Sequence, residues 1–183
     1  MIICISGFPG SGKSTVGSEL IAMGFRVLEV SSTIKDKMTE EGVEIDPKSI
    51  EEYTGAMKAK YGKGVFARAT AQKVRDSDKD VAIIGMRSVE ELNAVRETIG
   101  SKIPFVLLTA PKSTRYKRLS ERPKLPIKSY SVFMMRETSN IDMGIGELTG
   151  HADFIIANSG TKEELKAALS DVLDMIRNTA NPK

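Results

Sequence analysis

Five short apolar runs recur along the chain, separated by longer stretches in which apolar residues return every three or four positions. Short continuous runs are typical of strands buried on both faces of a parallel sheet, and the longer spacing is typical of amphipathic helices. Strands that alternate with helices build an α/β fold. We therefore expect a single domain over residues 1–183, a five-stranded parallel sheet with helices on both faces. The predicted strands are 1–6, 26–30, 81–85, 103–109 and 154–157.

Capping residues and glycines mark the ends of the predicted helices. Ser88 with Glu91, and Thr161 with Glu164, form capping boxes, and Asp46 precedes a first-turn proline. Ser31 or Ser32 could cap a short helix that Gly42 ends. The residues from 178 onward are expected to fray. The predicted helices are 13–23, 32–41, 47–61, 65–75, 89–99, 113–122, 129–140 and 162–177.

Composition narrows the function classes. Hydrophobic residues make up 40% and charged residues 28% of the chain, which is typical of a soluble globular protein. The formal net charge of only +3 does not favour nucleic acid as the main partner, although a local basic cluster leaves that possibility open. The only cysteine, Cys4, falls in the first strand, so a disulfide framework is excluded and a cytoplasmic location is expected. No stretch approaches the length of a membrane span, so no membrane role is expected.

The first strand runs into a glycine-rich segment that closes on Gly-Lys-Ser, and a helical pattern follows. This order is that of a phosphate-binding P-loop, in which glycines let backbone N–H groups approach phosphate oxygens and the helix directs its positive end at the anion. We expect Lys13 to reach the β- and γ-phosphates of ATP and the Ser14 hydroxyl to ligate Mg²⁺. The alternative is an ordinary strand–turn–helix whose glycines only make a tight turn. The expected nucleotide-binding residues of the loop are Gly7, Pro9, Gly10, Ser11, Gly12, Lys13, Ser14 and Thr15.

Two further segments follow predicted strands, at the sheet edge where ligands of α/β proteins bind. Gly85-Met86-Arg87-Ser88 places an arginine there, and a guanidinium can bind a phosphate through two hydrogen bonds. The alternative is a surface arginine beside a helix cap. Asn158-Ser159-Gly160 ends the last strand, where Asn158 could contact a nucleotide base, although turn chemistry explains this segment equally well.

Arginines recur in the region after the fourth strand. Arg115, Arg118 and Arg122 are spaced to share one face of a predicted helix, and Arg136 lies on the next. Phosphoryl transfer spreads negative charge over the moving group, so we expect Arg118, Arg122 and Arg136 to close over it as part of a lid. A solvated basic face and a nucleic-acid-binding patch are the alternatives.

Taken together, these motifs resemble the nucleoside-monophosphate-kinase branch of the P-loop kinases. Within that branch, the chain is most similar to the archaeal adenylate-kinase-related proteins, which are akin to dephospho-coenzyme A kinases. The resemblance covers nearly the whole chain, and it implies a core sheet, an acceptor-binding insertion at about 43–76, a lid at about 111–140, and ATP with Mg²⁺. The motifs that carry it are 7–14, 85–88, the arginines at 115, 118, 122 and 136, 144–146, 152–153 and 158–160.

The chain departs from the family pattern mainly in its acids. Ile84 stands where the family usually has an acid, and Ser31 and Ser32 stand where another often follows the second strand. Such carboxylates hold Mg²⁺ through water or act as a general base. Glu29 is the closest remaining acid at the correct end of a strand. Three other positions also depart from the family pattern. Lys35 stands in the region where the family has a basic partner, and Lys58 stands where an arginine is common. Asn140, with Glu137 nearby, stands where the family has an acid.

A phosphate acceptor needs no strong base, and the expected activity is therefore ATP-dependent transfer to a nucleoside monophosphate or a similar small phosphorylated acceptor. Two other interpretations stay open. One is a kinase that resembles dephospho-coenzyme A kinase. The other is an ATP-binding regulatory or nucleic-acid-associated protein with weak or lost kinase activity, which the missing acids at Ile84 and Ser32 would explain. The sequence does not indicate an oligomeric state.

Overall fold

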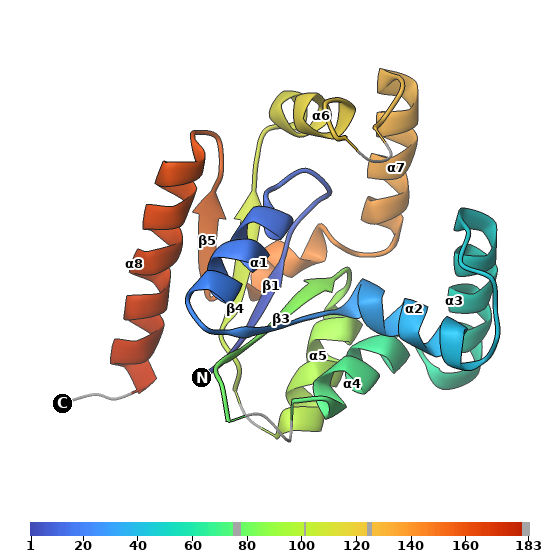
Figure 1. Ribbon diagram of the computed structural model, residues 1–183, viewed down its shortest axis with the longest axis horizontal. Coiled ribbons are helices and arrows are strands. Elements are labelled where there is room, and N and C mark those ends of the chain that lie inside the picture. The colour runs from blue at the N-terminus through green and yellow to red at the C-terminus, as the bar shows by residue number, and fades with distance from the viewer. Residues whose placement is uncertain (75–77, 101, 124–125, 181–183) are drawn as a thin grey trace.

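The computed structural model describes residues 1–74, 78–100, 102–123 and 126–180. Its five strands form one sheet in the order β2-β3-β1-β4-β5, and every neighbouring pair is parallel. Helices cover both faces of this sheet (Figure 1), which confirms the predicted fold class. The strands are β1 Ile2–Ser6, β2 Arg26–Glu29, β3 Val81–Met86, β4 Phe105–Thr109 and β5 Phe154–Ala157.

The described helices connect these strands as parallel topology requires. They are α1 Lys13–Ala22, α2 Val30–Glu40, α3 Pro47–Tyr61, α4 Val65–Gln72, α5 Val89–Ile99, α6 Lys112–Ser120, α7 Tyr130–Asp142, the 3₁₀ helix η1 Glu147–His151, and α8 Lys162–Ala180. No helix among the described residues combines the length and apolar composition needed to cross a membrane.

Each of β1 to β4 contributes to two hydrophobic cores because successive side chains point to opposite faces of the sheet, whereas the edge strand β5 contributes to one. In β1, Ile3 and Ile5 belong to the core under α1 and α8, whereas Cys4 belongs to the core under α4 and α5. All three side chains are fully buried. Burial on both faces explains why the strands are continuous apolar runs and why their existence is predictable from the sequence.

The predicted helix caps are confirmed where a side chain bonds to the backbone. Asp46 accepts hydrogen bonds from the N–H groups of Lys48 and Ser49 at 2.8 and 3.2 Å. Ser88 Oγ accepts from the Glu91 N–H, and Thr161 Oγ1 accepts from the Glu164 N–H, each at 3.2 Å.

Several predicted boundaries are wrong by a few residues. Val30 begins α2 rather than ending the second strand, so Glu29, and neither Ser31 nor Ser32, occupies the N-cap position. The helix predicted over 113–122 ends at Ser120, which leaves Arg122 beyond it. The helix predicted to reach Arg75 ends at Gln72, and Arg75 lies outside the described residues. The predicted frayed end is helical through Ala180, and 181–183 lie outside the described residues.

The segment between β2 and β3 contains helices of two kinds. α4 packs into the core through Phe66, Ala67 and Ala71, which are all buried. α3 has no buried residue and lies at the periphery, beyond α2 (Figure 1). Tyr53 and Phe66, whose ring centroids are 6.0 Å apart, join α3 to α4. Of the expected acceptor-binding insertion, α3 is therefore the part that contacts the core only through partly buried side chains, Tyr53 and Met57.

A buried ion pair fixes α6 and α7 over the first loop of the chain. Arg115 Nη1 and Nη2 donate to Glu137 Oε1 and Oε2 at 2.6 and 2.5 Å, and both side chains are buried. The same guanidinium donates to the carbonyls of Ala110 and Pro9 at 3.0 and 3.3 Å. Its centre lies 4.9 Å from the centroid of the Phe8 ring. Arg115 therefore holds α7 against the loop and does not belong to a solvated basic face.

We predict that Glu137→Gln destabilises the protein, because it leaves the buried guanidinium of Arg115 without a counter-charge. Breaking a buried ion pair by removing one partner costs about 3–5 kcal/mol. In a chain of this size that corresponds to a fall in Tm of roughly 10 °C. Thermal unfolding followed by circular dichroism measures the change. Glu121→Gln, which neutralises the exposed C-cap residue of α6, is the matched control and should leave Tm unchanged. Equal Tm values for the two variants would contradict this role of Glu137.

Candidate active site

The carboxyl ends of the five parallel strands meet at one edge of the sheet, and the loop from Gly7 to Gly12 occupies that edge between β1 and α1. Gly12 has φ +109°, and a Cβ atom there would lie 2.3 Å from Asn158 Nδ2. A Cβ atom on Gly7 would lie 2.3 Å from the carbonyl oxygen of Leu108. Both positions therefore require glycine because of close contacts with neighbouring strand ends.

Asn158 and Arg118 support this loop from outside it. Asn158 is buried, and its Nδ2 donates to the Ser11 carbonyl at 2.8 Å. Arg118 donates to the Asn158 carbonyl and to Asn158 Oδ1 at 3.1 and 3.2 Å, and to the Gly10 carbonyl at 3.4 Å. The Ser11 side chain is also buried, and its Oγ has no hydrogen-bond partner among the described residues. Asn158 and Arg118 thus preorganise the loop backbone.

Lys13 begins α1 and bends back over the loop. Its Nζ donates to the carbonyls of Gly7 and Phe8 at 2.6 and 3.1 Å. Burial, and after it the nearby positive charges of Arg87 and Arg122, lower the pKa of Lys13 from 10.5 to about 8. The carboxylate of Glu29 acts in the opposite direction. The ammonium group of Lys13 therefore lies in a region with an excess of positive charge.

Three concave spaces surround Lys13, the loop and the neighbouring arginines. The loop cavity, about 500 Å³, lies between the glycine loop, α6 and the start of α8. The α3 cavity, about 380 Å³, lies between the loop, α2, α3 and the end of β3. The arginine cleft, about 250 Å³, lies between α6 and α7. Arg87 lines all three spaces, and Lys13 lines the first two.

The predicted site residues divide among these spaces. The loop cavity is lined by Pro9, Gly10, Gly12, Lys13, Ser14, Thr15, Arg87, Arg118, Arg122 and Asn158. The arginine cleft is lined by Pro9, Arg87, Arg122 and Arg136. The α3 cavity is lined by Gly7, Pro9, Lys13, Ser14 and Arg87. Ser11 is the one predicted loop residue that lines none of the three.

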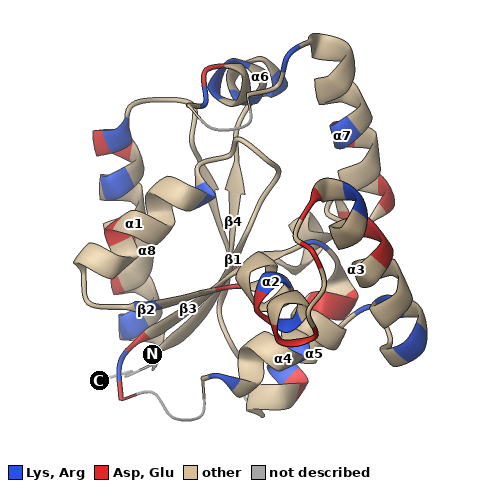
Figure 2. Cartoon of the chain, turned by 45° about the vertical axis from the view of Figure 1, so that its right-hand side comes forward, with Lys and Arg blue, Asp and Glu red and all other residues tan. Residues whose placement is uncertain are grey.

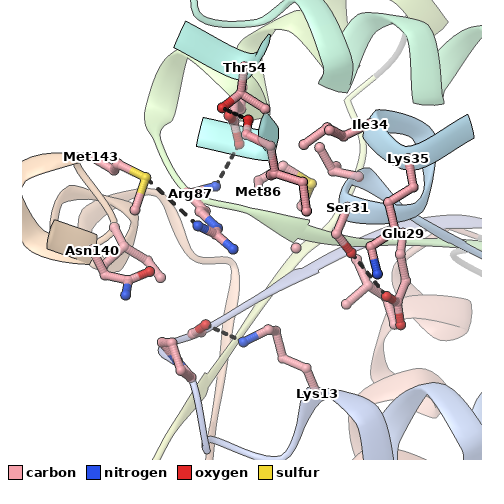
Figure 3. A pocket seen from close by; sticks show the side chains of 18 of the residues that line it. Lys13, Glu29, Ser31, Ile34, Lys35, Thr54, Met86, Arg87, Asn140 and Met143 are labelled. Atoms are coloured by element: carbon pink, nitrogen blue, oxygen red, sulfur yellow. Dashed lines mark hydrogen bonds between the residues drawn. The ribbon is translucent and has the colours of Figure 1, made fainter. Parts of the chain in front are cut away.

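Arg87 and Lys13 both reach into the α3 cavity, from above and below in the view of Figure 3. The Arg87 side chain is exposed, and its Nη1 lies 3.8 Å from Met143 Sδ. Arg122 and Arg136 are also exposed. No ion pair involves Arg87, Arg122 or Arg136 within the described part of the chain. Their charges are therefore available to an anion. Lys and Arg also occur along α6, above the loop (Figure 2).

Glu29 lies beside Ile84, the position at which the family pattern has an acid. In the pairing of β2 with β3, Glu29 is the partner of Ile84, so its carboxylate lies one strand to the side. Glu29 lines the α3 cavity together with Lys13 and Ser14, and one of its oxygens accepts a hydrogen bond from Ser31 Oγ at 3.2 Å (Figure 3). The described residues contain no group of three or more His, Cys, Asp or Glu side chains suited to a metal ion.

Sequence reasoning missed the role of Glu91. It predicted only a helix-capping function, but the buried Glu91 carboxylate also pairs with Lys58 of α3 at 3.0 Å. It accepts a further hydrogen bond from the Arg87 N–H at 2.8 Å. This capping box lies immediately after the arginine at the end of a strand, and that position is the sequence signal that could have suggested a role beyond capping.

These residues fit a nucleotide with Mg²⁺. The cations around Lys13 outnumber the acids, so a polyphosphate would relieve their mutual repulsion. The preorganised loop directs backbone groups at the same space, and the N-terminus of α1 favours an anion there. Ser14 and Glu29 line one cavity and provide the oxygen atoms that Mg²⁺ prefers.

The comparisons with known proteins agree with this geometry. The model of a family described as an AAA domain matches residues 3–142. A UPF0200 protein of Saccharolobus islandicus is 30% identical over 178 residues, covering 96% of this chain and 93% of the relative. Three solved structures share the fold, each over at least 94% of both chains. They are a Thermus thermophilus protein (TM-score 0.69, 22% identity), a sugar kinase from a Janibacter species (0.64, 15%) and a shikimate kinase from Aquifex aeolicus (0.56, 17%).

The likeness to these solved structures shows the fold. The family match and the archaeal relative show the family to which the chain belongs. Both agree with the glycine loop and the parallel sheet described above. The chain belongs to the P-loop family matched by the AAA-domain model and, within it, to the UPF0200 proteins of archaea.

Proposed function

We propose that this protein is a kinase that transfers the γ-phosphoryl group of ATP to a nucleoside monophosphate or a similar small phosphorylated acceptor. The P-loop and the kinase-like fold support ATP-dependent phosphoryl transfer in general. The finer proposal depends on one observation: Arg87 and Lys13 each line both the loop cavity and the α3 cavity. Two ligands placed in these cavities would bring their phosphates to the same pair of cations.

The loop cavity suits the donor nucleotide. Its wall includes the loop from Pro9 to Thr15, whose backbone groups and Lys13 would hold the terminal phosphates. Asn158 and Gly160 also line this cavity and would lie beside the rest of the nucleotide. Both polar atoms of the Asn158 amide already bond to protein groups, so any contact with the base would be through the surface of that side chain.

Mg²⁺, when bound, would neutralise part of the charge on the phosphate oxygens. We propose that the Ser14 hydroxyl ligates it and that the Glu29 carboxylate holds one of its water molecules. Glu29 lines the same cavity as Ser14, and no ion pair involves Glu29 within the described residues. The acid would thus come from β2 rather than from the position of Ile84 on β3.

The arginines would stabilise the charge that develops during transfer. Arg87, Arg122 and Arg136 line the arginine cleft, and Arg87 also lines both cavities. Since the negative charge of the moving group spreads over its three outer oxygens, cations placed around it lower the barrier. Arg118, which bonds to the carbonyls of Gly10 and Asn158, would add a fixed positive charge on the donor side.

The α3 cavity suits an acceptor that combines an anionic group with an apolar or aromatic body. Lys35 and Arg87 supply positive charge, and Ile34, Ile50 and Ile145 supply apolar surface. The oxygens of an acceptor phosphate are largely deprotonated at neutral pH, so such an acceptor needs no general base. An acceptor hydroxyl would need one, and of the two acids that line this cavity, Glu91 is already bonded to Lys58 and Arg87, and Glu29 is the acid proposed to hold the metal-bound water. This asymmetry favours the phosphorylated acceptor.

The direct test measures phosphate transfer from labelled ATP with Mg²⁺ to a panel of nucleoside monophosphates, dephospho-coenzyme A and simple sugars. We expect product with at least one monophosphate, and a loss on the order of 10³-fold in Lys13→Ala, in line with the loss of one charge-stabilising group. Transfer only to a hydroxyl acceptor would mean that the group phosphorylated is a hydroxyl and not a phosphate. ATP binding without transfer to any acceptor would favour a regulatory protein, and undiminished turnover in Lys13→Ala would remove the kinase assignment.

The lowered pKa of Lys13 predicts how ATP binding depends on pH. In the free protein, the ammonium group loses its proton as the pH rises through about 8. Bound phosphates stabilise the protonated form, so binding takes up a proton near this pH, and affinity falls as the pH increases further. Titration calorimetry in two buffers of different ionisation enthalpy measures the uptake. Lys13→Arg keeps its charge throughout this range and should show no such uptake, whereas equal proton uptake by both proteins would rule out Lys13 as its source.

The proposed role of Glu29 predicts an altered metal dependence in Glu29→Gln. The Mg²⁺ concentration that half-maximally strengthens ATP binding should rise about tenfold, the lower end of the effect of losing an outer-sphere metal partner. ATP binding without Mg²⁺ should not weaken, because the variant removes a negative charge near the phosphates. Calorimetric titrations of ATP at several Mg²⁺ concentrations measure both values. Glu40→Gln, an exposed residue at the end of α2, is the control. An unchanged Mg²⁺ dependence in Glu29→Gln would contradict the assignment.

A further inference from the structure

Glu91 is a buried carboxylate that bonds to two separate parts of the α3 cavity. Its side chain is 5% exposed, and Oε1 lies 3.0 Å from Lys58 Nζ on α3. Oε2 accepts the N–H of Arg87 at 2.8 Å, where the backbone leaves β3. One side chain thus joins the acceptor-side helix to the residue that lines all three spaces of the site.

Helix capping alone does not account for this arrangement. In a capping box, the glutamate reaches back to the N–H of the N-cap residue. Here the N-cap is Ser88, whose Oγ accepts the Glu91 N–H, but the Glu91 carboxylate reaches one residue further, to Arg87. The other oxygen is directed away from α5 and toward α3. The carboxylate therefore fixes the backbone that presents Arg87 while it holds Lys58.

Apart from Tyr53 and Met57, which pack against the core, and the hydrogen bond from the Tyr53 hydroxyl to Glu41 at 2.9 Å, this contact is what attaches α3 to its neighbours. None of its residues is buried. Its residues Ile50, Thr54 and Lys58 are spaced four apart, so they share one helical face, and that face lines the cavity. Among the described ion pairs of α3, Lys48 with Glu52 stays within the helix, and Lys58 with Glu91 alone reaches another element.

We propose that Glu91 is a positioning residue for the acceptor, a proposal that rests on the kinase function proposed above. By bonding to Lys58 and to the Arg87 N–H together, it sets the separation between the α3 face and Arg87. The cavity then has a fixed width when the acceptor enters. Loss of the Lys58 pair leaves α3 held by its packing against α2 and α4 and by the hydrogen bond from Tyr53 to Glu41.

The neighbouring ion pair provides a matched control. Lys63 Nζ, just after α3, lies 2.7 Å from Glu90 Oε1, and these side chains are 67% and 49% exposed. Glu90→Gln therefore removes one ion pair between the same two regions of the chain, at an adjacent residue of the same helix, but outside the cavity. Exposed pairs of this kind contribute little to stability.

The first experiment needs no acceptor. Hydrogen–deuterium exchange of the full-length protein compares the wild type with Glu91→Gln, Lys58→Met and Glu90→Gln. Glu91→Gln and Lys58→Met should raise the exchange rate of the α3 amides about tenfold, the effect expected when a hydrogen bond between charged groups is lost. Glu90→Gln should leave them unchanged. If exchange in Glu91→Gln rises only at the start of α5, Glu91 is a helix cap and the proposal fails, whether or not the protein is a kinase.

The second experiment separates acceptor positioning from catalysis, using the acceptor found in the transfer panel. Glu91→Gln should raise the KM for the acceptor about tenfold or more and leave the KM for ATP unchanged. Glu90→Gln should match the wild type in both. Equal increases in both KM values, or a fall in kcat alone, would overturn the proposal. A wild type that transfers phosphate to no acceptor would instead remove the proposed function, and the exchange result would still decide the role of Glu91.

Discussion

The repulsion among cations at the carboxyl edge of the sheet is the constraint around which this site is organised. Lys13 begins α1 directly after the glycine loop, and burial together with the nearby charges of Arg87 and Arg122 lowers its pKa to about 8. Glu29 offsets only part of this charge. A folded chain accepts such unfavourable electrostatics where a ligand relieves them, and perturbed ionisable groups accordingly concentrate at functional sites. The polyphosphate of a nucleotide has the charge and the size to do so.

The acids of the site show which cations hold the structure and which are left for a ligand. Glu137 neutralises Arg115 in the interior and thereby holds α7 to the loop. Glu91 pairs with Lys58 and positions α3. Arg122 and Arg136, by contrast, have exposed side chains that line the arginine cleft between α6 and α7. Two buried carboxylates thus hold the walls of the site together, whereas the charges of the arginines that line it are left for a ligand.

Local sequence patterns predict most of the fold but less of the site. The central strands β1, β3 and β4 are buried on both faces and are therefore readable apolar runs, and Ser88 and Thr161 cap their helices through bonds that span only three residues. The glycine loop is equally local. Arg115 is different, because its partner Glu137 lies 22 residues away, and no local spacing distinguishes a buried arginine from an exposed one. Similarly, the position of Glu29 beside Ile84 follows from the pairing of β2 with β3, which only the folded sheet defines.

The central claim is that the glycine loop and its cations bind the phosphates of a nucleotide. Calorimetric titration of the wild-type protein with ATP in the presence of Mg²⁺, alongside adenosine as a ligand without phosphates, tests it most directly. We expect ATP to bind with a Kd between about 1 μM and 1 mM, the usual range for enzymes and their substrates. Adenosine should bind at least about a hundredfold more weakly, since it has no phosphates and therefore makes none of the hydrogen bonds between charged groups. No detectable ATP binding at millimolar concentrations, or equal affinity for adenosine, would contradict the account.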